Sequence, residues 1–338
     1  MINKNINKCK PDSRVGGGLA GNVDEIDVEK QQRRHTLRRL MIYLLISFGI
    51  PYVIIFIYIA NVGWTIENDW YGVVPAVAML CPAVAHVLTR LITHEGFTDS
   101  YFAMKIKGNV RYFVIGLCFP VIVGILLFLG AVLFLTPQGT LEASLQKIDY
   151  GVFLSTTIYV VSVSIASVLL GFGEEFGWRG YMMPKLEQLM PGPAAVIVGG
   201  TIWGLWHAPL IACGHNFGTG YAGYPWVGIG LMCISCIAIG FYLTALTKAT
   251  HSVLPASLAH IAINNVCGAV SGTLLGYVEI SDERLIEINS TLDYPLIMMI
   301  VISVLSVLTG VAVTLLRSRN KEYRPCKNSQ SPLKNGII

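Results

Sequence analysis

Long apolar runs constrain this chain more than any other feature of its sequence. About eight segments of roughly 20 residues carry few charges, which is the length a helix needs to cross a bilayer. Continuous runs favour helices over a barrel, whose strands are about ten residues long and alternate in polarity. The sequence therefore predicts an all-α polytopic membrane bundle of about eight transmembrane helices, at about 40–60, 72–91, 112–135, 152–173, 194–211, 225–246, 252–276 and 295–316.

The composition excludes a soluble domain. Of the 338 residues, 54% are hydrophobic and only 13% are charged, whereas a typical soluble domain has roughly 25% charged residues. The formal net charge is +4, and the basic residues lie mostly in the tails and in alternate loops. This distribution indicates membrane topology and not a nucleic-acid interface, so we expect no nucleic-acid partner.

The polar termini and the basic residues beside them predict how the chain is divided and oriented. Residues 1–39 are polar and read as a flexible cytoplasmic tail, residues 40–316 as the transmembrane bundle, and residues 317–338 as a second cytoplasmic tail. Basic residues flank the bundle on both sides, including Arg38, Arg39, Arg317 and Arg319. Because Lys and Arg concentrate on the cytoplasmic side, we expect a multi-pass protein of the cell membrane with both termini in the cytoplasm.

Two adjacent glutamates, Glu174 and Glu175, follow the apolar run at 152–173. Carboxylates next to a bilayer core are costly and are rarely kept without a partner or a function. Arg179 lies four residues after Glu175, on the same face of a helix, whereas Glu174 is turned by about 100°. We therefore expect Glu175 to pair with Arg179 and Glu174 to be available as a general base. The alternative is an ion pair that only caps a helix at the interface.

Polar residues recur inside two later apolar runs. His207 falls well inside the predicted fifth span, and His260 with Asn264 has the spacing of four that places both side chains on one helical face. Taken alone, His207 would read as a packing residue, and the pair as a clamp between helices. Together with the glutamates, they supply a base, an imidazole and a pair of donors, as amide hydrolysis requires.

The three motifs in this order resemble the CPBP family of intramembrane endopeptidases, which includes the type II CAAX prenyl proteases and the bacterial Abi, or bacteriocin-immunity, proteins. The resemblance rests on Glu-Glu-Phe-Gly-Trp-Arg-Gly-Tyr-Met-Met-Pro at 174–184, on an aromatic residue four before His207, and on His260 with Asn264. It covers the protease-like core at about 150–275. Trp203 stands where the family more often has Phe, a conservative departure.

The resemblance implies a role for each candidate residue. Glu174 would activate the attacking water with help from His207. His260 and Asn264 would bind the developing oxyanion, and Glu175 with Arg179 would hold the first motif in place. The implied activity is hydrolysis of peptide bonds in membrane-associated or lipidated protein or peptide substrates, as CAAX-type proteolysis or as bacteriocin- or immunity-related processing.

A metal ion such as zinc is a second possibility for activating water. If a divalent metal is bound, Glu174, His207 and His260 are its candidate ligands, since two His and one Glu leave an open position on zinc. The chain lacks an H-E-x-x-H motif, because His94-Glu95 has no second His at the required spacing. The sequence therefore favours water activation without a metal.

Two other functions use the same polar residues. An ion-coupled transporter would employ the intramembrane Glu and His groups as a proton relay. Such carriers tend to have paired halves, whereas the polar residues here gather in one half. A non-catalytic immunity factor would keep the fold and bind a partner, but it would have no reason to retain the three motifs together.

The predicted depths of the site residues disagree. At 1.5 Å per residue, His207 would lie about 20 Å and His260 about 12 Å from the cytoplasmic face, with Glu174 near that face. Either the fourth span, at 152–173, is placed too early, or a water-filled cavity extends from the cytoplasm to the histidines.

Overall fold

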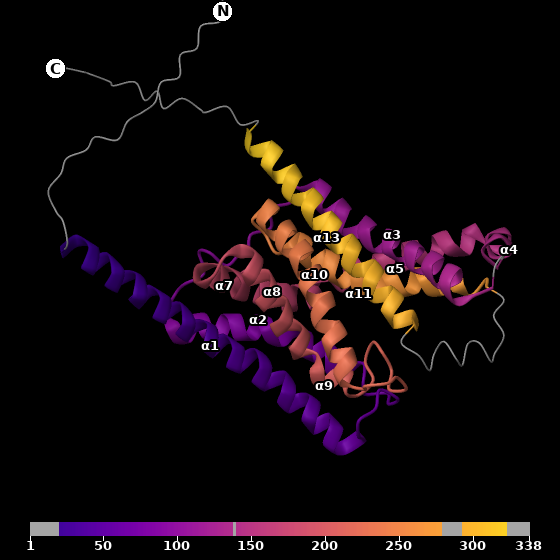
Figure 1. Ribbon diagram of the computed structural model, residues 1–338, viewed down its shortest axis with the longest axis horizontal. Coiled ribbons are helices and arrows are strands. Elements are labelled where there is room, and N and C mark those ends of the chain that lie inside the picture. The colour runs from indigo at the N-terminus through magenta and orange to yellow at the C-terminus, as the bar shows by residue number, and fades with distance from the viewer. Residues whose placement is uncertain (1–19, 138–139, 279–292, 323–338) are drawn as a thin grey trace, which may run out of the picture.

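The computed structural model describes residues 20–137, 140–278 and 293–322, and within these ranges the regular structure is helical, without a strand (Figure 1). The predicted all-α class is confirmed. The elements are α1 (Ala20–Val62), α2 (Val73–Thr93), α3 (Val110–Leu135), α4 (Thr140–Lys147), α5 (Tyr150–Ala166), α6 (Val168–Gly177), the π-helix η1 (Trp178–Met182), α7 (Met183–Leu189), α8 (Gly192–Trp206), α9 (Ala208–Ile211), α10 (Trp226–Thr250), α11 (Leu254–Leu275) and α13 (Asp293–Glu322).

Six helices in the described ranges are long and apolar enough to cross a membrane, namely α1, α2, α3, α10, α11 and α13. A seventh span results if α4 and α5, which meet at 81°, count as one. The protein is thus a multi-pass membrane bundle, with fewer full-length spans than the eight expected. The predicted fifth span, at 194–211, corresponds to α8, which has only 15 residues. A helix of that length extends about 22 Å, less than the roughly 30 Å of a hydrocarbon core.

The predicted fourth span, at 152–173, is divided into two helices. Its first part is α5, which ends at Ala166, and a break at Ser167 separates α5 from α6. Hydropathy does not detect this break, because the residues on both sides of it are apolar. The break allows α6 to enter the interior of the bundle as a separate short helix.

The terminal helices are longer than the sequence suggested. α1 begins at Ala20, so residues 20–39 of the predicted flexible tail continue the first span as a helix. This stretch has no proline and is rich in Glu, Lys, Gln and Arg, which are good helix formers. Likewise α13 continues to Glu322, past the predicted start of the second tail at residue 317. The remaining tail residues, 1–19 and 323–338, lie outside the described residues.

The short helix α6 packs against α2 on one side and α11 on the other. Glycines allow these close approaches: a Cβ on Gly173 would come within 2.6 Å of the Met79 carbonyl oxygen of α2, and one on Gly177 would overlap Pro82. On the other side, a Cβ on Gly171 would overlap the Ser257 carbonyl of α11. A side chain at any of these three glycines would therefore push α6 away from its neighbours.

The outer helices enclose this centre. α1 and α13 lie on opposite sides of the bundle, with α7, α8 and α10 between them (Figure 1). α11 packs against α3, α5 and α6, while α10 packs against α8 and α13. The glutamate motif of α6 is thus held in the interior, between two helices that carry polar side chains of their own.

Candidate active site

The two glutamates of α6 are buried, with 2% of Glu174 and none of Glu175 exposed. They lie in the last turn of α6, immediately before the π-helix η1. A π-turn within a helix is rare and is frequently found at functional sites, because it changes the direction in which the neighbouring side chains point. The local backbone here is therefore unusual at the position where the sequence predicts the chemistry.

Glu175 binds two partners through a single oxygen. Its Oε1 accepts a hydrogen bond from Nη1 of Arg179 at 2.8 Å, as the spacing of four predicted. The same oxygen lies 2.8 Å from Nδ1 of His260 on α11. The second contact joins residues 85 positions apart and was not predicted. Glu175 therefore orients the imidazole of His260, in addition to pairing with Arg179.

Glu174 is held by two indole groups. Its Oε2 accepts hydrogen bonds from Nε1 of Trp178 at 3.1 Å and from Nε1 of Trp203 at 2.8 Å. The other oxygen, Oε1, lies 3.9 Å from Nε2 of His260. This distance is too long for a direct hydrogen bond, but it suits a water that bridges the two atoms. One carboxylate oxygen is thus fixed, and the other faces a histidine across a gap.

The remaining candidates share a cavity with these two groups. A cavity of about 410 Å³ is lined by Glu174, His207, His260 and Asn264, together with apolar walls that include Met299. His207 follows the last residue of α8, and its Nδ1 lies 2.9 Å from the Trp203 carbonyl. Since a carbonyl only accepts, Nδ1 carries the hydrogen, which leaves Nε2 as the second nitrogen of the ring. The structure thus brings all three predicted motifs together.

The structure places Glu174 on a different element from the one predicted. Glu174 belongs to α6 and not to a continuous fourth span, because the chain breaks at Ser167. α6 packs against α11, and Oε1 of Glu174 lies 3.9 Å from Nε2 of His260 on that helix. Glu174, His207 and His260 line one cavity, and the two explanations of the difference in depth stay predictions.

Sequence reasoning missed the tryptophans as ligands of Glu174 and did not single out His215, which also lines the cavity. A signal for the tryptophans was present, because Trp178 lies four residues after Glu174, and Trp203 lies four residues before His207. One helical turn separates each indole from a candidate catalytic residue. No comparable spacing marks His215.

The candidate metal ligands do not form a metal centre in this arrangement. Within the described residues, no group of three or more His, Cys, Asp or Glu side chains is placed so that it could hold a metal ion. Glu174, His207 and His260 line one cavity, but they do not converge on one point as zinc ligands do.

Comparisons with known proteins point to one family. Residues 156–266 match the family model described as type II CAAX prenyl endopeptidase Rce1-like. CAAX prenyl protease 2 of Methanococcus maripaludis is 26% identical to this chain over 172 residues. The alignment covers 50% of this chain and 60% of that relative's length. The matched region contains α6, η1, α8 and α10, and it includes every predicted site residue from Glu174 to Asn264.

Proposed function

We propose that this chain, a member of the type II CAAX prenyl endopeptidase (Rce1-like) family, is a membrane endopeptidase that hydrolyses a peptide bond by attack of a water molecule. The observation that carries the proposal is the 3.9 Å gap between Oε1 of Glu174 and Nε2 of His260 on the wall of a cavity. The gap accommodates the attacking water, and the cavity accommodates the peptide bond.

In this mechanism Glu174 is the general base. Its Oε2 is engaged by Trp178 and Trp203, so Oε1 is directed toward the gap. Oε1 takes a proton from the water as the water oxygen attacks the carbonyl carbon. When the carbon–nitrogen bond breaks, the same proton passes to the leaving amine. The products are a carboxylic acid and an amine, with one water consumed.

His260 stabilises the negative charge on the carbonyl oxygen. Two buried carboxylates, Glu174 and Glu175, face a single guanidinium, that of Arg179, so a protonated His260 balances the charge of the cluster. Its Nδ1–H donates to Glu175, and the hydrogen bond of its Nε2–H passes from the water in the gap to the substrate oxygen once the water has attacked. Asn264, one turn along α11, supplies a second donor from the same cavity wall.

The other two predicted residues have supporting roles. Arg179 and Glu175 form a buried pair that fixes the orientation of His260, as a third group fixes the base in a catalytic triad. His207 presents Nε2 to the cavity wall and assists the movement of the water proton. No step passes through a metal ion, because the three candidate ligands do not fit a metal centre in this arrangement.

The substrate we propose is a membrane-associated protein or peptide, and within that class a lipidated one. The relative in M. maripaludis is named a CAAX prenyl protease. An enzyme within a bilayer meets substrates that a lipid already holds at the membrane. We also place both termini on the cytoplasmic side, since basic residues border the first and last spans.

Proteoliposomes containing the purified protein test this function. The probes are two peptides ending in C-a-a-X, one with a prenylated cysteine and one without a lipid. We expect wild-type protein to release the last three residues of the prenylated peptide. Glu174→Gln should reduce the rate by about 10²–10⁴, the usual contribution of a general base. Glu67→Gln, at an exposed loop position, should retain the wild-type rate.

Either of two results would overturn the proposal. One is cleavage by Glu174→Gln at the wild-type rate. The other is the absence of cleavage of both peptides by wild-type protein that instead takes up solute in response to a pH gradient, as an ion-coupled carrier would.

A further inference from the structure

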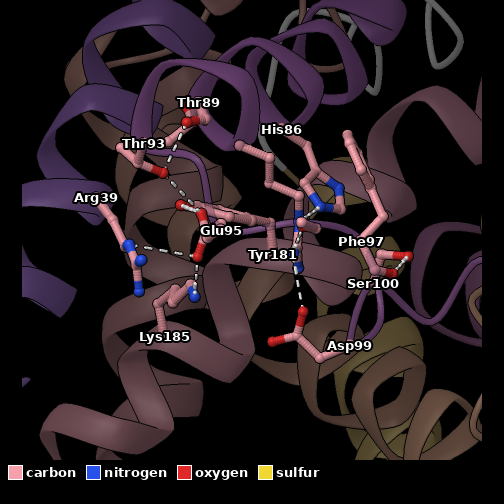
Figure 2. Close-up of polar contacts among 12 residues, drawn as sticks. Arg39, His86, Thr89, Thr93, Glu95, Phe97, Asp99, Ser100, Tyr181 and Lys185 are labelled. Atoms are coloured by element: carbon pink, nitrogen blue, oxygen red, sulfur yellow. Dashed lines mark hydrogen bonds and ion pairs between the residues drawn. The ribbon is translucent and has the colours of Figure 1, made fainter.

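A second polar cluster lies where the last part of α2 and the loop after it pack against α6 and η1, and its members do not line the cavity. We call it the α2 clamp and define it as His86 and Arg90 of α2 with Glu95 and Asp99 of the loop that follows. Figure 2 shows Glu95 meeting Arg39 and Lys185, with His86 and Asp99 in the same view. The proposed reaction uses none of them.

His86 makes the contact nearest to the catalytic glutamates. It is fully buried, and its Nδ1 lies 2.7 Å from the backbone carbonyl oxygen of Phe176, two residues after Glu174. Its ring also packs between the rings of Phe176 and Tyr181, with centroids 4.2 Å and 4.8 Å away. His86 thus contacts the main chain at Phe176, just before the π-turn, and the ring of Tyr181 inside the π-turn.

Arg90 determines which nitrogen of His86 carries the hydrogen. The Arg90 Nε–H donates to Nε2 of His86 at 2.5 Å, so Nε2 accepts and Nδ1 must be the donor to the carbonyl. Arg90 is in turn held by the Gly96 carbonyl and by Asp99, whose Oδ1 is 2.7 Å from Nη1. A chain of contacts therefore runs from Asp99 through Arg90 and His86 to the backbone of α6.

Glu95 holds the segment at two further points, Tyr181 within the π-turn and Lys185 beyond it. Its carboxylate accepts a hydrogen bond from the Tyr181 hydroxyl at 2.5 Å and pairs with Nζ of Lys185 at 2.6 Å. Nε of Arg39, on α1, lies 3.5 Å from the same carboxylate (Figure 2). Contacts at Phe176 and at Lys185 thus lie on the two sides of the π-turn, with the Tyr181 contact within it.

We propose that His86 is a positioning residue for the proteolysis described above: by holding the Phe176 carbonyl, it fixes the direction in which α6 presents Glu174 to the cavity. The inference rests on the proposed function. In a π-turn each backbone N–H bonds to the carbonyl five residues back instead of four. We infer that the hydrogen bond from His86 to the Phe176 carbonyl determines at which residue this change begins. A shift of the register would rotate Glu174 away from Trp203 and from the gap beside His260.

The test compares three variants in proteoliposomes with the prenylated peptide. His86→Phe keeps the size and the ring packing but removes the donor to Phe176. His86→Asn places an amide N–H close to the position of Nδ1 and restores that donor. His35→Phe, at an exposed histidine of α1, is the matched control. Measurements are kcat, KM, the thermal midpoint in detergent and hydrogen–deuterium exchange of the peptide that covers 172–186.

We expect His86→Phe to lower kcat by about 10²-fold, the cost of a misplacement of about 1 Å, with KM within twofold of wild type. Exchange should accelerate within 172–186 in this variant alone, and His86→Asn should recover most of kcat. His35→Phe should match wild type in every measurement.

Three results would overturn the inference: a wild-type kcat in His86→Phe, an unchanged exchange pattern in that variant, or equal losses of kcat and thermal midpoint in the Phe and Asn variants. The last pattern would indicate a structural role only. If wild-type protein cleaves no peptide and exchange still accelerates in His86→Phe alone, the control of α6 by His86 is supported and the proposed proteolysis is not.

Discussion

The α6–η1 segment has two polar faces that differ in how completely they are paired. On the face toward α11, Oε1 of Glu174 stands 3.9 Å from His260 across a cavity that Asn264 also lines. On the face toward α2, the clamp is closed: Glu95 binds Tyr181 and Lys185, and His86 uses both ring nitrogens. A face that acts on a substrate must leave space for it, whereas a face that holds a helix is most effective when fully bonded.

The same difference predicts what substitutions on each face will do. Removing a group beside the cavity should reduce turnover more than stability, because that group has few protein partners to lose. Removing a group from a fully bonded cluster should reduce stability, since its partners are left buried and unpaired. Replacing Glu175 should reduce both turnover and stability, because this residue contacts His260 of the cavity wall and is fully buried.

Glu175→Gln should therefore have the largest effect on stability. Arg179 and His260 both depend on Oε1 of Glu175, and removing one partner of a buried ion pair typically costs about 3–5 kcal/mol of unfolding free energy. Denaturant unfolding in detergent measures the change. The control is Glu187→Gln, whose partner Lys248 is partly exposed, and we expect a loss of about 1 kcal/mol or less there. Equal losses in the two variants would contradict the assignment of Glu175 to a buried pair.

Asn264→Ala should affect turnover and leave stability nearly unchanged. Loss of one oxyanion donor lowers kcat by about 10²–10³ in enzymes that use one. The neighbouring Asn265 provides a matched control, because its amide donates to Ser164 at 3.2 Å and lies outside the cavity lining. Asn265→Ala should retain kcat. If the two variants lose turnover to the same degree, Asn264 has no special role in the site.

Local patterns made much of this site predictable. The Glu175–Arg179 pair and the shared face of His260 and Asn264 both follow from a spacing of four, which describes a single helical turn. Long-range pairs have no such signal. The contact between His260 and Glu175 spans 85 residues, and a histidine in an apolar run has the same appearance in the sequence whether or not it meets a carboxylate.

The fold, like the site, was predictable only where a local sequence pattern determines it. Apolar runs identified the membrane bundle, because hydrophobic length alone decides whether a helix can cross a bilayer. The break at Ser167 was not predictable in this way, because it lies within a continuous apolar run. The α2 clamp was missed for a related reason: His86 and Arg90 lie near the end of a span, where polar residues are expected simply because water is close.

Gly177→Ala tests the close approach of α2 to α6 on the closed face. The added methyl group would overlap Pro82, and overpacking of this kind typically costs about 1–3 kcal/mol. Gly192→Ala is the control, since a Cβ there meets nothing within 4 Å. Thermal unfolding in detergent should separate the two variants. A wild-type midpoint in Gly177→Ala would mean that α2 does not constrain the glutamate helix.

Asp99→Asn should change the free energy of unfolding least among these variants. The dependence of that change on pH is the specific sign of the ion pair between Asp99 and Arg90. Burial by itself would raise the pKa of Asp99, but the hydrogen bond and the charge of Arg90 outweigh it and lower that pKa. A lowered pKa means that the folded protein holds the charged form more tightly than the unfolded chain does. The resulting stabilisation is complete above the unfolded pKa of about 3.9 and is lost as pH falls through the lower, folded pKa.

More than half of the Asp99 side chain is exposed, so solvent screening should limit the difference from wild type to about 0.2–1 kcal/mol. Unfolding of wild type and Asp99→Asn should therefore differ by a constant amount between pH 8 and pH 5, and the two curves should converge as the pH falls below about 3.9 toward the lower, folded pKa. A difference that grows on acidification would reverse the sign and show that the Arg90–Asp99 contact is not a stabilising ion pair. Glu67→Gln, tested in parallel, should show no such convergence, because this side chain is exposed in a loop.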